Sequence, residues 1–326
     1  MRRRQFSALA VLTVLALPTT AACQGGVDGS ASDGNTAGAT TVKVAHVPST
    51  LFAPLYLAEA KGYFEEQGLR VQLQKVQAGQ DAVPLAGTGK VDAVVAGFSA
   101  GLFNGMEQGL KVDVVASMGA STGTQPSPTA LEVARSALDS GGVKRVADLK
   151  GKRIAVAGGA GAAGGYQLAA TLRGEGLTLK DVTVVNVPMA DMGGALADGG
   201  VDAALAPAPF TTAMEERGVA SPLAVPPRGT SATGVVFGTA FAHRPAAEKF
   251  LTALRKGAAD LQGPGATSEE NLTVLARATG QKLDVLRRTP PYQWDPQLTV
   301  DNQQLTAQRA AYQDAGLLKG GAGAQG

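Results

Sequence analysis

A glycine-flanked serine at residues 97–101 has the GxSxG spacing of a hydrolase nucleophile. The stretch reads GFSAG and follows the apolar, strand-like residues 91–96. In α/β hydrolases this serine stands on a sharp strand-to-helix turn and is activated by a downstream histidine. His243 is the one histidine downstream of Ser99. A secreted serine hydrolase that uses Ser99 and His243 is therefore one hypothesis for this chain.

A second copy of the same strand and turn lacks the serine. The stretch VDAVVAGFSAG begins at Val91, and VDAALAPAPFT begins at Val201, 110 residues later. Both continue into a helical pattern that contains a Met-Glu pair and ends at a glycine. Because the turn recurs without its hydroxyl, we interpret Ser99 as a hydrogen-bonding group of a binding site and not as a nucleophile.

A glycine-rich turn at residues 159–164 has the GxGxxG spacing of dinucleotide-binding proteins. That function also requires an acidic residue at the end of the next strand, to bind the ribose. Here the next strand ends in Val185-Asn186-Val187, so NAD is not expected. Glycines nevertheless let backbone N–H groups approach a ligand, and a helix N-terminus favours an anion or a strong acceptor. The turn is thus either part of a binding site or a packing turn.

The composition gives little support to metal or cofactor chemistry. The histidines His46 and His243 are far apart, and Cys23 is the single cysteine, so no metal-ligand spacing is present. We expect neither a metal nor a cofactor. His46 ends the first predicted strand, where either a ligand contact or a buried structural role is consistent with the sequence.

Strand and helix patterns alternate twice along the chain in the same order. The first half has strands near residues 43–46, 69–76 and 91–97, and the second half has them near residues 153–157, 182–187 and 201–207. Alternation of this kind predicts βαβ units with parallel sheets. The predicted fold class is α/β, with two similar lobes that each contain a parallel-rich sheet flanked by helices.

Four turns follow the strands and should face one crevice, because ligands bind at the carboxyl ends of strands in open α/β sheets. The turns are residues 46–54, 97–101, 158–165 and 206–211. They contain hydroxyl groups and phenylalanines and no Arg, Lys, Asp or Glu, which is typical of an apolar site with a few polar contacts. Asp81 and Asp191 lie in nearby loops. The predicted ligand-binding residues are His46, Ser49, Thr50, Phe52, Phe98, Ser99, Gly159, Gly161, Ala162, Phe210 and Thr211.

The N-terminus has the order of an export signal. Arg2, Arg3 and Arg4 precede an apolar run, small residues and Cys23. The run is too short to span a bilayer, and Arg3-Arg4 also resembles a twin-arginine signal. Loss of residues 1–22 would remove three arginines and no acids, leaving 26 Lys+Arg against 27 Asp+Glu. Without a basic excess, nucleic-acid binding is not expected.

Composition also divides the rest of the chain. Residues 24–41 have almost no large apolar side chains and are predicted to be a flexible tether. Ser/Thr/Pro-rich residues 121–129 and residues 225–234 are predicted crossings between the lobes. The predicted organisation is a signal peptide at 1–22, a lipid-anchored tether at 23–41, the first lobe at 42–120, the second lobe at 121–228, a return to the first lobe with C-terminal helices at 229–318, and a disordered tail at 319–326.

Several of these stretches resemble the nitrate/sulfonate/taurine (NitT/TauT) family of substrate-binding proteins for ABC importers. The most specific are AEAKGYFEEQGL at residues 58–69 and DLKGKRIAV at residues 148–156, and the resemblance spans roughly residues 42–318. Residues 20–23, TAAC, resemble the lipobox in which bacterial lipoproteins are lipidated at cysteine. The family resemblance implies a type II periplasmic-binding fold with the solute held in the cleft between the lobes.

The resemblance implies a receptor and not an enzyme. It would be a monomer, anchored to the outer face of the cytoplasmic membrane through Cys23, and its partners would be a small organic solute, a permease and an ATPase. A sulfonate, nitrate or taurine-type anion and a small heteroaromatic both remain open as solutes. A pyrimidine-synthase-like enzyme of the same fold is the second alternative, besides the hydrolase.

Overall fold

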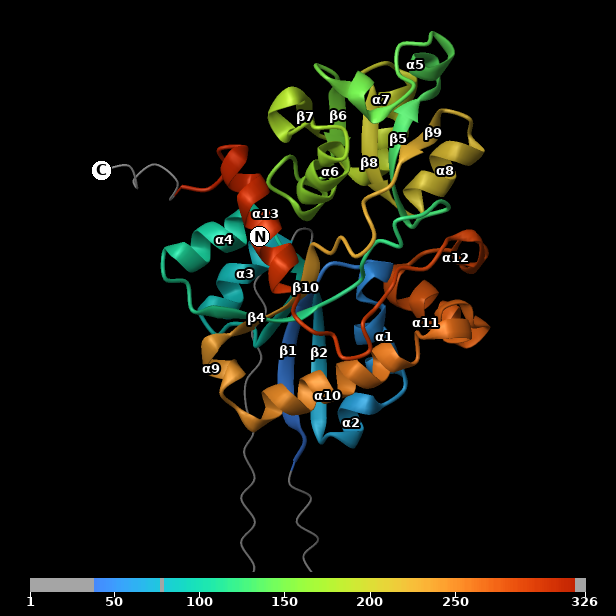
Figure 1. Ribbon diagram of the computed structural model, residues 1–326. Coiled ribbons are helices and arrows are strands. Elements are labelled where there is room, and N and C mark those ends of the chain that lie inside the picture. The colour runs from blue at the N-terminus through green and yellow to red at the C-terminus, as the bar shows by residue number, and fades with distance from the viewer. Residues whose placement is uncertain (1–37, 77–78, 320–326) are drawn as a thin grey trace, which may run out of the picture. The chain divides into compact units, whose positions relative to one another are not determined.

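Two five-stranded sheets form the centres of two lobes in the computed structural model (Figure 1). The structure describes residues 38–76 and 79–319. The predicted signal peptide and Cys23 lie outside these residues, as do most of the predicted tether and nearly all of the predicted tail. The predicted α/β class with two lobes is confirmed.

The first sheet has the strand order β2-β1-β3-β10-β4. Strand β1 pairs in parallel with β2 and β3, and β10 pairs antiparallel with β3 and β4. The strand bounds are β1 Thr40–His46, β2 Leu69–Lys75, β3 Ala93–Gly97, β4 Val112–Ser117 and β10 Thr233–Gly238. Strand β1 therefore begins inside the segment predicted to be a tether.

The second sheet repeats this arrangement with the order β7-β6-β8-β5-β9. Strand β6 is parallel to β7 and β8, and β5 is antiparallel to β8 and β9. The bounds are β5 Thr129–Ala134, β6 Arg153–Val156, β7 Thr183–Asn186, β8 Ala203–Pro207 and β9 Ala220–Ala224. Each sheet thus contains one antiparallel strand that enters from the other lobe, β10 in the first and β5 in the second.

The helices cover both sheets, and most of the later ones return to the first lobe (Figure 1). The bounds in the first lobe are α1 Ala53–Ala60, α2 Tyr63–Glu66, α3 Gly79–Gly87, α4 Ala100–Glu107, α9 Thr239–Ala242, α10 Pro245–Ala259, α11 Glu269–Thr279 and α12 Leu283–Arg288. Those in the second lobe are α5 Arg135–Asp139, α6 Ala163–Arg173, α7 Met192–Ala197 and α8 Phe210–Glu216. Helix α13, Asn302–Asp314, lies beside α4 and α6. No helix within the described ranges has the length and apolar character needed to cross a bilayer.

Local chemistry explains where these helices begin and end. Gly62, whose φ of 75° is left-handed, separates α1 from α2. The Ser268 side chain caps α11 by accepting a hydrogen bond from the Asn271 N–H. Asp301 caps α13 in the same way.

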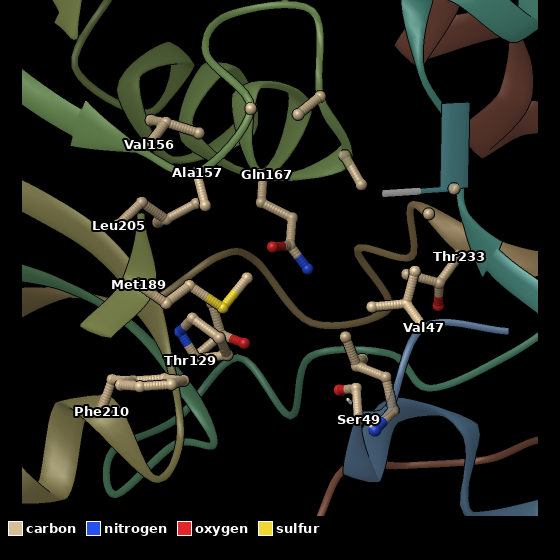
Figure 2. Close-up of a pocket in the computed structure, with 18 of the residues that line it drawn as sticks. Val47, Ser49, Thr129, Val156, Ala157, Gln167, Met189, Leu205, Phe210 and Thr233 are labelled. Atoms are coloured by element: carbon tan, nitrogen blue, oxygen red, sulfur yellow. Dashed lines mark hydrogen bonds between the residues drawn. The ribbon is translucent and has the colours of Figure 1, made fainter. Parts of the chain in front are cut away.

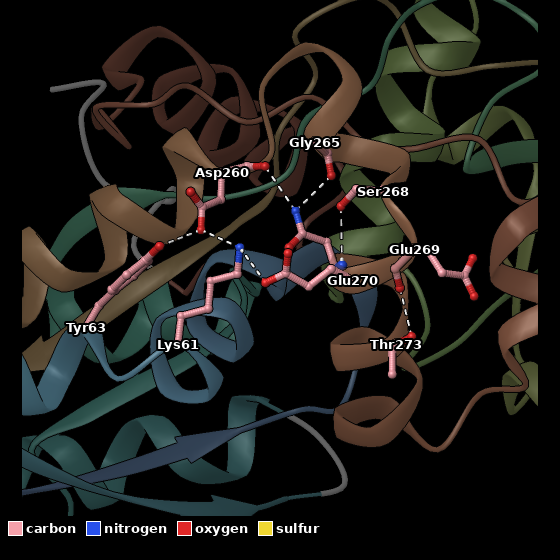
Figure 3. Close-up of polar contacts among 9 residues, drawn as sticks. Lys61, Tyr63, Asp260, Gly265, Ser268, Glu269, Glu270 and Thr273 are labelled. Atoms are coloured by element: carbon pink, nitrogen blue, oxygen red, sulfur yellow. Dashed lines mark hydrogen bonds and ion pairs between the residues drawn. The ribbon is translucent and has the colours of Figure 1, made fainter.

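A polar network joins the first helix to the end of α10 (Figure 3). The Lys61 Nζ lies 2.8 Å from Asp260 Oδ2 and 3.5 Å from Glu270 Oε1. The Tyr63 hydroxyl donates a 2.7 Å hydrogen bond to the same Asp260 oxygen. Asn271 Nδ2 donates to the backbone oxygens of Asp260 and Gly265. The Asp260 carboxylate therefore ties the α1–α2 turn to the α10–α11 connection.

We expect Asp260→Ala to lower the free energy of unfolding by about 1–2 kcal/mol, because it removes a charge-assisted hydrogen bond and the partner of a partly buried ammonium. Urea unfolding measures this. Glu248→Ala is the control, since its ion pair with Arg255 is more exposed, and exposed pairs contribute about 0–1 kcal/mol. Equal losses in the two variants would contradict the assignment.

Candidate binding pocket between the two sheets

A pocket of about 270 Å³ lies between the carboxyl ends of the two sheets (Figure 2). Its walls come from both lobes, including the β1–α1 loop, the ends of β3 and β8, and the starts of α6 and α8. The apolar wall consists of Val47, Pro48, Leu51, Phe52, Val156, Ala157, Ala163, Met189, Leu205, Pro207, Ala208 and Phe210. A cavity of this kind at the carboxyl ends of strands is the common place for a small-molecule site.

Polar groups on the wall are hydroxyls and carboxamides, and none of the described lining residues is charged. They are Ser49, Gln80, Ser99, Thr129, Gln167, Thr233 and Gln281. An ion of either sign would enter this pocket without an opposite charge from the described lining, and transfer of an unpaired charge out of water is costly. The lining therefore favours an uncharged guest, or an anion that is stabilised by backbone N–H groups alone.

Most of the hydroxyls already have protein partners. Ser49 Oγ accepts a 3.2 Å hydrogen bond from the Leu51 N–H, and Ser99 Oγ accepts one of 3.2 Å from the Leu102 N–H. Thr129 Oγ1 lies 2.9 Å from the Tyr292 hydroxyl. Ser49 and Ser99 thus act as helix caps in the structure.

The Gln167 carboxamide differs from these groups because it makes no hydrogen bond with a described residue. Gln167 lies on α6, is 8% exposed, and points into the open centre of the pocket (Figure 2). The Gln281 Oε1, from another residue of the pocket lining, is buried without a partner among the described residues. A buried polar atom without a hydrogen bond costs about 1–3 kcal/mol, so Gln281 Oε1 is suited to a ligand that donates one. The Gln167 carboxamide can bond to a ligand in the same pocket.

The N-termini of α4 and α6 meet at the back of the pocket, and they differ in their free N–H groups. At α4, the Ala100 N–H donates to the Gly161 carbonyl across the lobes at 2.9 Å. Helix α6 has no side-chain cap at Ala162, and the N–H groups of Ala163 and Gly164 have no acceptor among the described residues. Helix α6 can therefore donate to an acceptor oxygen of a ligand.

His46 lies behind this wall and not on it. It is 1% exposed, and its Nδ1 is 3.0 Å from the Tyr56 hydroxyl. That hydroxyl in turn lies 3.3 Å from the Val47 carbonyl. Burial, with a smaller contribution from Lys75, lowers the pKa of His46, so the imidazole is neutral near pH 7. Through the Tyr56 hydroxyl, which bonds to the Val47 carbonyl and the Ser49 N–H, His46 helps to hold the loop from Val47 to Ser49.

Of the predicted site residues, the structure places Ser49, Phe52, Ser99, Ala162 and Phe210 on the pocket wall. Six others do not line the pocket, and the reasons are local. Gly159 and Gly161 shape the turn before α6 with their backbone, and the remaining four side chains are buried elsewhere: His46, Thr50, Phe98 and Thr211. Asp81 and Asp191 are exposed and also do not line the pocket.

Phe98 follows β3 in one of the predicted turns, but its side chain is buried in the core. Its ring packs in the core against Gly234, where an added Cβ would lie 2.5 Å from the Phe98 Cζ. Its carbonyl accepts a 2.8 Å hydrogen bond from Gln308 Nε2 on α13.

The three glutamines of the wall were not predicted from the sequence, and neither were Thr129, Thr233 and Met189. Gln167 follows the glycine-rich turn by one helical turn, so helical spacing was a usable signal. Gln281 comes from the α11–α12 connection, and no sequence pattern relates it to the other walls.

The hydrolase pair is not brought together. Ser99 follows β3 at Gly97, which pairs with Thr233 at the start of β10. His243 comes after α9, beyond Gly238 at the opposite end of β10. Within the described residues, no group of three His, Cys, Asp or Glu side chains is arranged to hold a metal.

Comparison with known families gives a match over most of the described chain. A family model described as NMT1/THI5 like matches residues 49–264. The chain belongs to this family. Strands of both sheets and most of the pocket wall fall within the matched region, so the family fold includes the candidate site.

Solved structures with the same fold support the predicted resemblance. The alkanesulfonate-binding protein SsuA from Xanthomonas axonopodis pv. citri bound to MOPS has a TM-score of 0.66 and 22% identity, covering 86% of this chain and 94% of that one. The periplasmic nitrate-binding protein NrtA from Synechocystis PCC 6803 has a TM-score of 0.65 and 15% identity, covering 87% and 83%. The predicted resemblance to nitrate/sulfonate/taurine substrate-binding proteins, with its type II periplasmic-binding fold, is confirmed at the level of the fold.

One curated relative has an enzyme's name. This NMT1/THI5-like chain is 33% identical over 153 residues to the 4-amino-5-hydroxymethyl-2-methylpyrimidine phosphate synthase of Aspergillus parasiticus. The match covers 47% of this chain and 41% of the relative. The chain thus matches less than half of that enzyme's length.

Proposed function

We propose that this NMT1/THI5-like protein is an extracytoplasmic solute-binding receptor of an ABC importer, and that it captures a small organic solute in the pocket between its lobes. The observation that supports this most directly is the pocket itself, with walls from two lobes and a buried, unpartnered Gln167 carboxamide at its centre. Closure of the lobes over a solute is driven only by the contacts that the solute gains in the closed form.

The solute that fits this lining best is uncharged. Gln167 offers one donor and one acceptor side by side, Gln281 Oε1 needs a donor, and the start of α6 needs an acceptor. A flat molecule with adjacent C=O and N–H groups satisfies all three, while Met189 and Phe210 cover its apolar faces. Of the two solute classes left open by the sequence, this favours the small heteroaromatic over the sulfonate or nitrate anion.

Mass spectrometry of small molecules released from the natively purified protein tests the proposal without assuming a ligand. Thermal shift with a panel of sulfonates, nitrate, taurine, pyrimidines and flavins then ranks the classes. A ligand present at 100 times its Kd stabilises the folded state by about 2.7 kcal/mol. Stabilisation by the uncharged heterocycles is the expected result, stabilisation by sulfonates alone would contradict the solute class, and no stabilisation by any member together with no released molecule would contradict the receptor.

We expect Gln167→Leu to weaken binding of the solute identified in this way by about 10-fold or more, because a ligand amide would lose both partners. Isothermal titration calorimetry measures the change. Gln108→Leu is the control, since Gln108 is exposed at the end of α4. Unchanged affinity in Gln167→Leu would show that the carboxamide does not contact the solute.

The anchoring proposal concerns Cys23 and residues 1–22. We propose that the signal is removed, that Cys23 is lipidated, and that the monomer works with a permease and an ATPase at the outer face of the cytoplasmic membrane. Cys23→Ser is expected to move the protein from the membrane fraction to the soluble fraction. Mass spectrometry of the mature N-terminus would detect the lipid directly.

A pyrimidine-synthase-like enzyme is the second candidate, and the 33% identical relative favours it. The two candidates differ in what happens to the bound molecule. A receptor releases its solute chemically unchanged, whereas a synthase forms a pyrimidine phosphate. Mass spectrometry of the purified protein before and after incubation in a cell extract distinguishes them.

A further inference from the structure

Helix α13 lies at the boundary between the lobes, beside α4 of the first lobe and α6 of the second (Figure 1). Several contacts attach it to the first lobe. Arg309 Nη1 is 3.0 Å from Glu107 Oε1 on α4, and Asn104 Nδ2 donates a 3.0 Å hydrogen bond to the Leu317 carbonyl. The Asp301 N–H donates to Ser117 Oγ at 3.2 Å. The helix is therefore held at both ends by the first lobe.

Only two side-chain hydrogen bonds in the described residues join α13 to the second lobe. The Tyr312 hydroxyl, fully buried, donates a 2.8 Å bond to the Ala162 carbonyl at the start of α6. The Tyr166 hydroxyl on α6 donates a 2.7 Å bond to Gln304 Oε1. Gln308 Nε2 also donates to the Phe98 carbonyl on the first lobe. Gln308 and Tyr312 of α13 thus bond to backbone carbonyls of both lobes, at Phe98 in the first and Ala162 in the second.

The lobes touch directly at the same place, through small residues. A Cβ added to Gly97 on β3 would lie 2.6 Å from the Ala163 Cβ on α6, and one added to Gly161 would lie 3.4 Å from the Ala100 Cβ. Gly97 and Ala163 both line the pocket. The contact that α13 spans is therefore also a part of the binding site.

We propose that α13 is a clasp that positions the two halves of the pocket, and that it stays with the first lobe when the lobes separate. The hydrogen bonds from Tyr166 and Tyr312 are then made only when the lobes are closed. The buried residues of α13 are Gln308, Ala311 and Tyr312. Loss of one such bond is expected to lower the ratio of closed to open molecules by about 3–10-fold. This inference concerns the lobes of the protein itself and does not depend on the identity of the solute.

The distance between two spin labels tests the clasp without added solute. Labels are placed on exposed residues of the two lobes, with Gln108→Cys and Glu175→Cys in a Cys23→Ser background. Tyr166→Phe removes one hydroxyl, and it is expected to increase the population with long label separations by about 3–10-fold. Tyr63→Phe is the matched control, because its hydroxyl bonds to Asp260 within the first lobe.

The Gln304 side of the bond gives a second, independent variant. Gln304→Leu removes the acceptor and should open the lobes as Tyr166→Phe does. Gln304→Glu keeps an acceptor oxygen and should leave the label distances as they are in the parent protein. The clasp is overturned if Tyr166→Phe and Gln304→Leu leave the distances unchanged, or if Tyr63→Phe changes them equally. A null result in the solute panel would not affect this test, so failure of the receptor proposal and failure of the clasp are distinguishable.

Discussion

Gly97→Ala is expected to force the lobes apart and to weaken solute binding by about 10–100-fold. The new methyl group would lie 2.6 Å from the Ala163 Cβ, which is closer than side-chain carbons approach one another. Overpacking typically costs about 1–3 kcal/mol, and each ~1.4 kcal/mol is a factor of ten in affinity. Because Ala163 belongs to the other lobe, the strain can be relieved by opening the pocket and not only by unfolding. The pair of spin labels described above measures the opening, and calorimetry with the copurified solute measures the affinity.

The control for this variant is Gly101→Ala on the first turn of α4. A Cβ there meets only Ser99 Oγ, at 3.4 Å, which is an ordinary contact. We expect parent distances and parent affinity. If Gly97→Ala keeps the parent affinity and the parent distances, the close approach of β3 and α6 is not needed for binding.

Glu132→Gln is expected to stabilise the protein at alkaline pH. Glu132 is in the middle of β5 and is fully buried, and neither carboxyl oxygen has a hydrogen-bond partner among the described residues. Burial, with a smaller contribution from the nearby Glu215 carboxylate on α8, raises the pKa of Glu132 to about 8. Glu132 is therefore protonated in the folded protein near pH 7.

The direction of the pH effect follows from the two states. Between about pH 4.5 and pH 8, the folded protein keeps the Glu132 proton and the unfolded chain has lost it, so the stability of the parent protein falls as the pH rises through this range. The neutral amide introduced by Glu132→Gln removes that dependence. We expect the melting temperature of the variant, relative to the parent, to be ~5 °C higher at pH 8 than at pH 5, for a difference on the order of 2–3 kcal/mol.

Calorimetric melts of the parent and of Glu132→Gln over this pH range provide the measurement. Glu175→Gln is the control, because Glu175 is exposed on the same lobe. If the stability of the parent and that of Glu132→Gln change by the same amount between pH 5 and pH 8, Glu132 does not keep its proton in the folded protein.

Local patterns were sufficient to predict most strands and the pairing of the two halves. The duplicated VDA strands appear as β3 and β8, each in the third position of its sheet. The antiparallel strands β5 and β10 were not predicted, because their position depends on which lobe the chain enters next and not on their own residues. The break between α1 and α2 at Gly62 depends on its positive φ, which a glycine within an apolar helical pattern does not by itself predict.

The sequence by itself determined the α/β class, the internal duplication and the turns that form the pocket, because strand and helix periodicity and glycine chemistry act over a few residues. Only the tertiary structure decided which side chains face the pocket. Phe98 packs in the core, while Gln167 and Gln281, from segments far apart in the chain, both line the pocket. The contact between the lobes at Gly97, and the position of α13 beside it, depend on the packing of segments that are distant in the chain. No periodicity within a single segment encodes such packing.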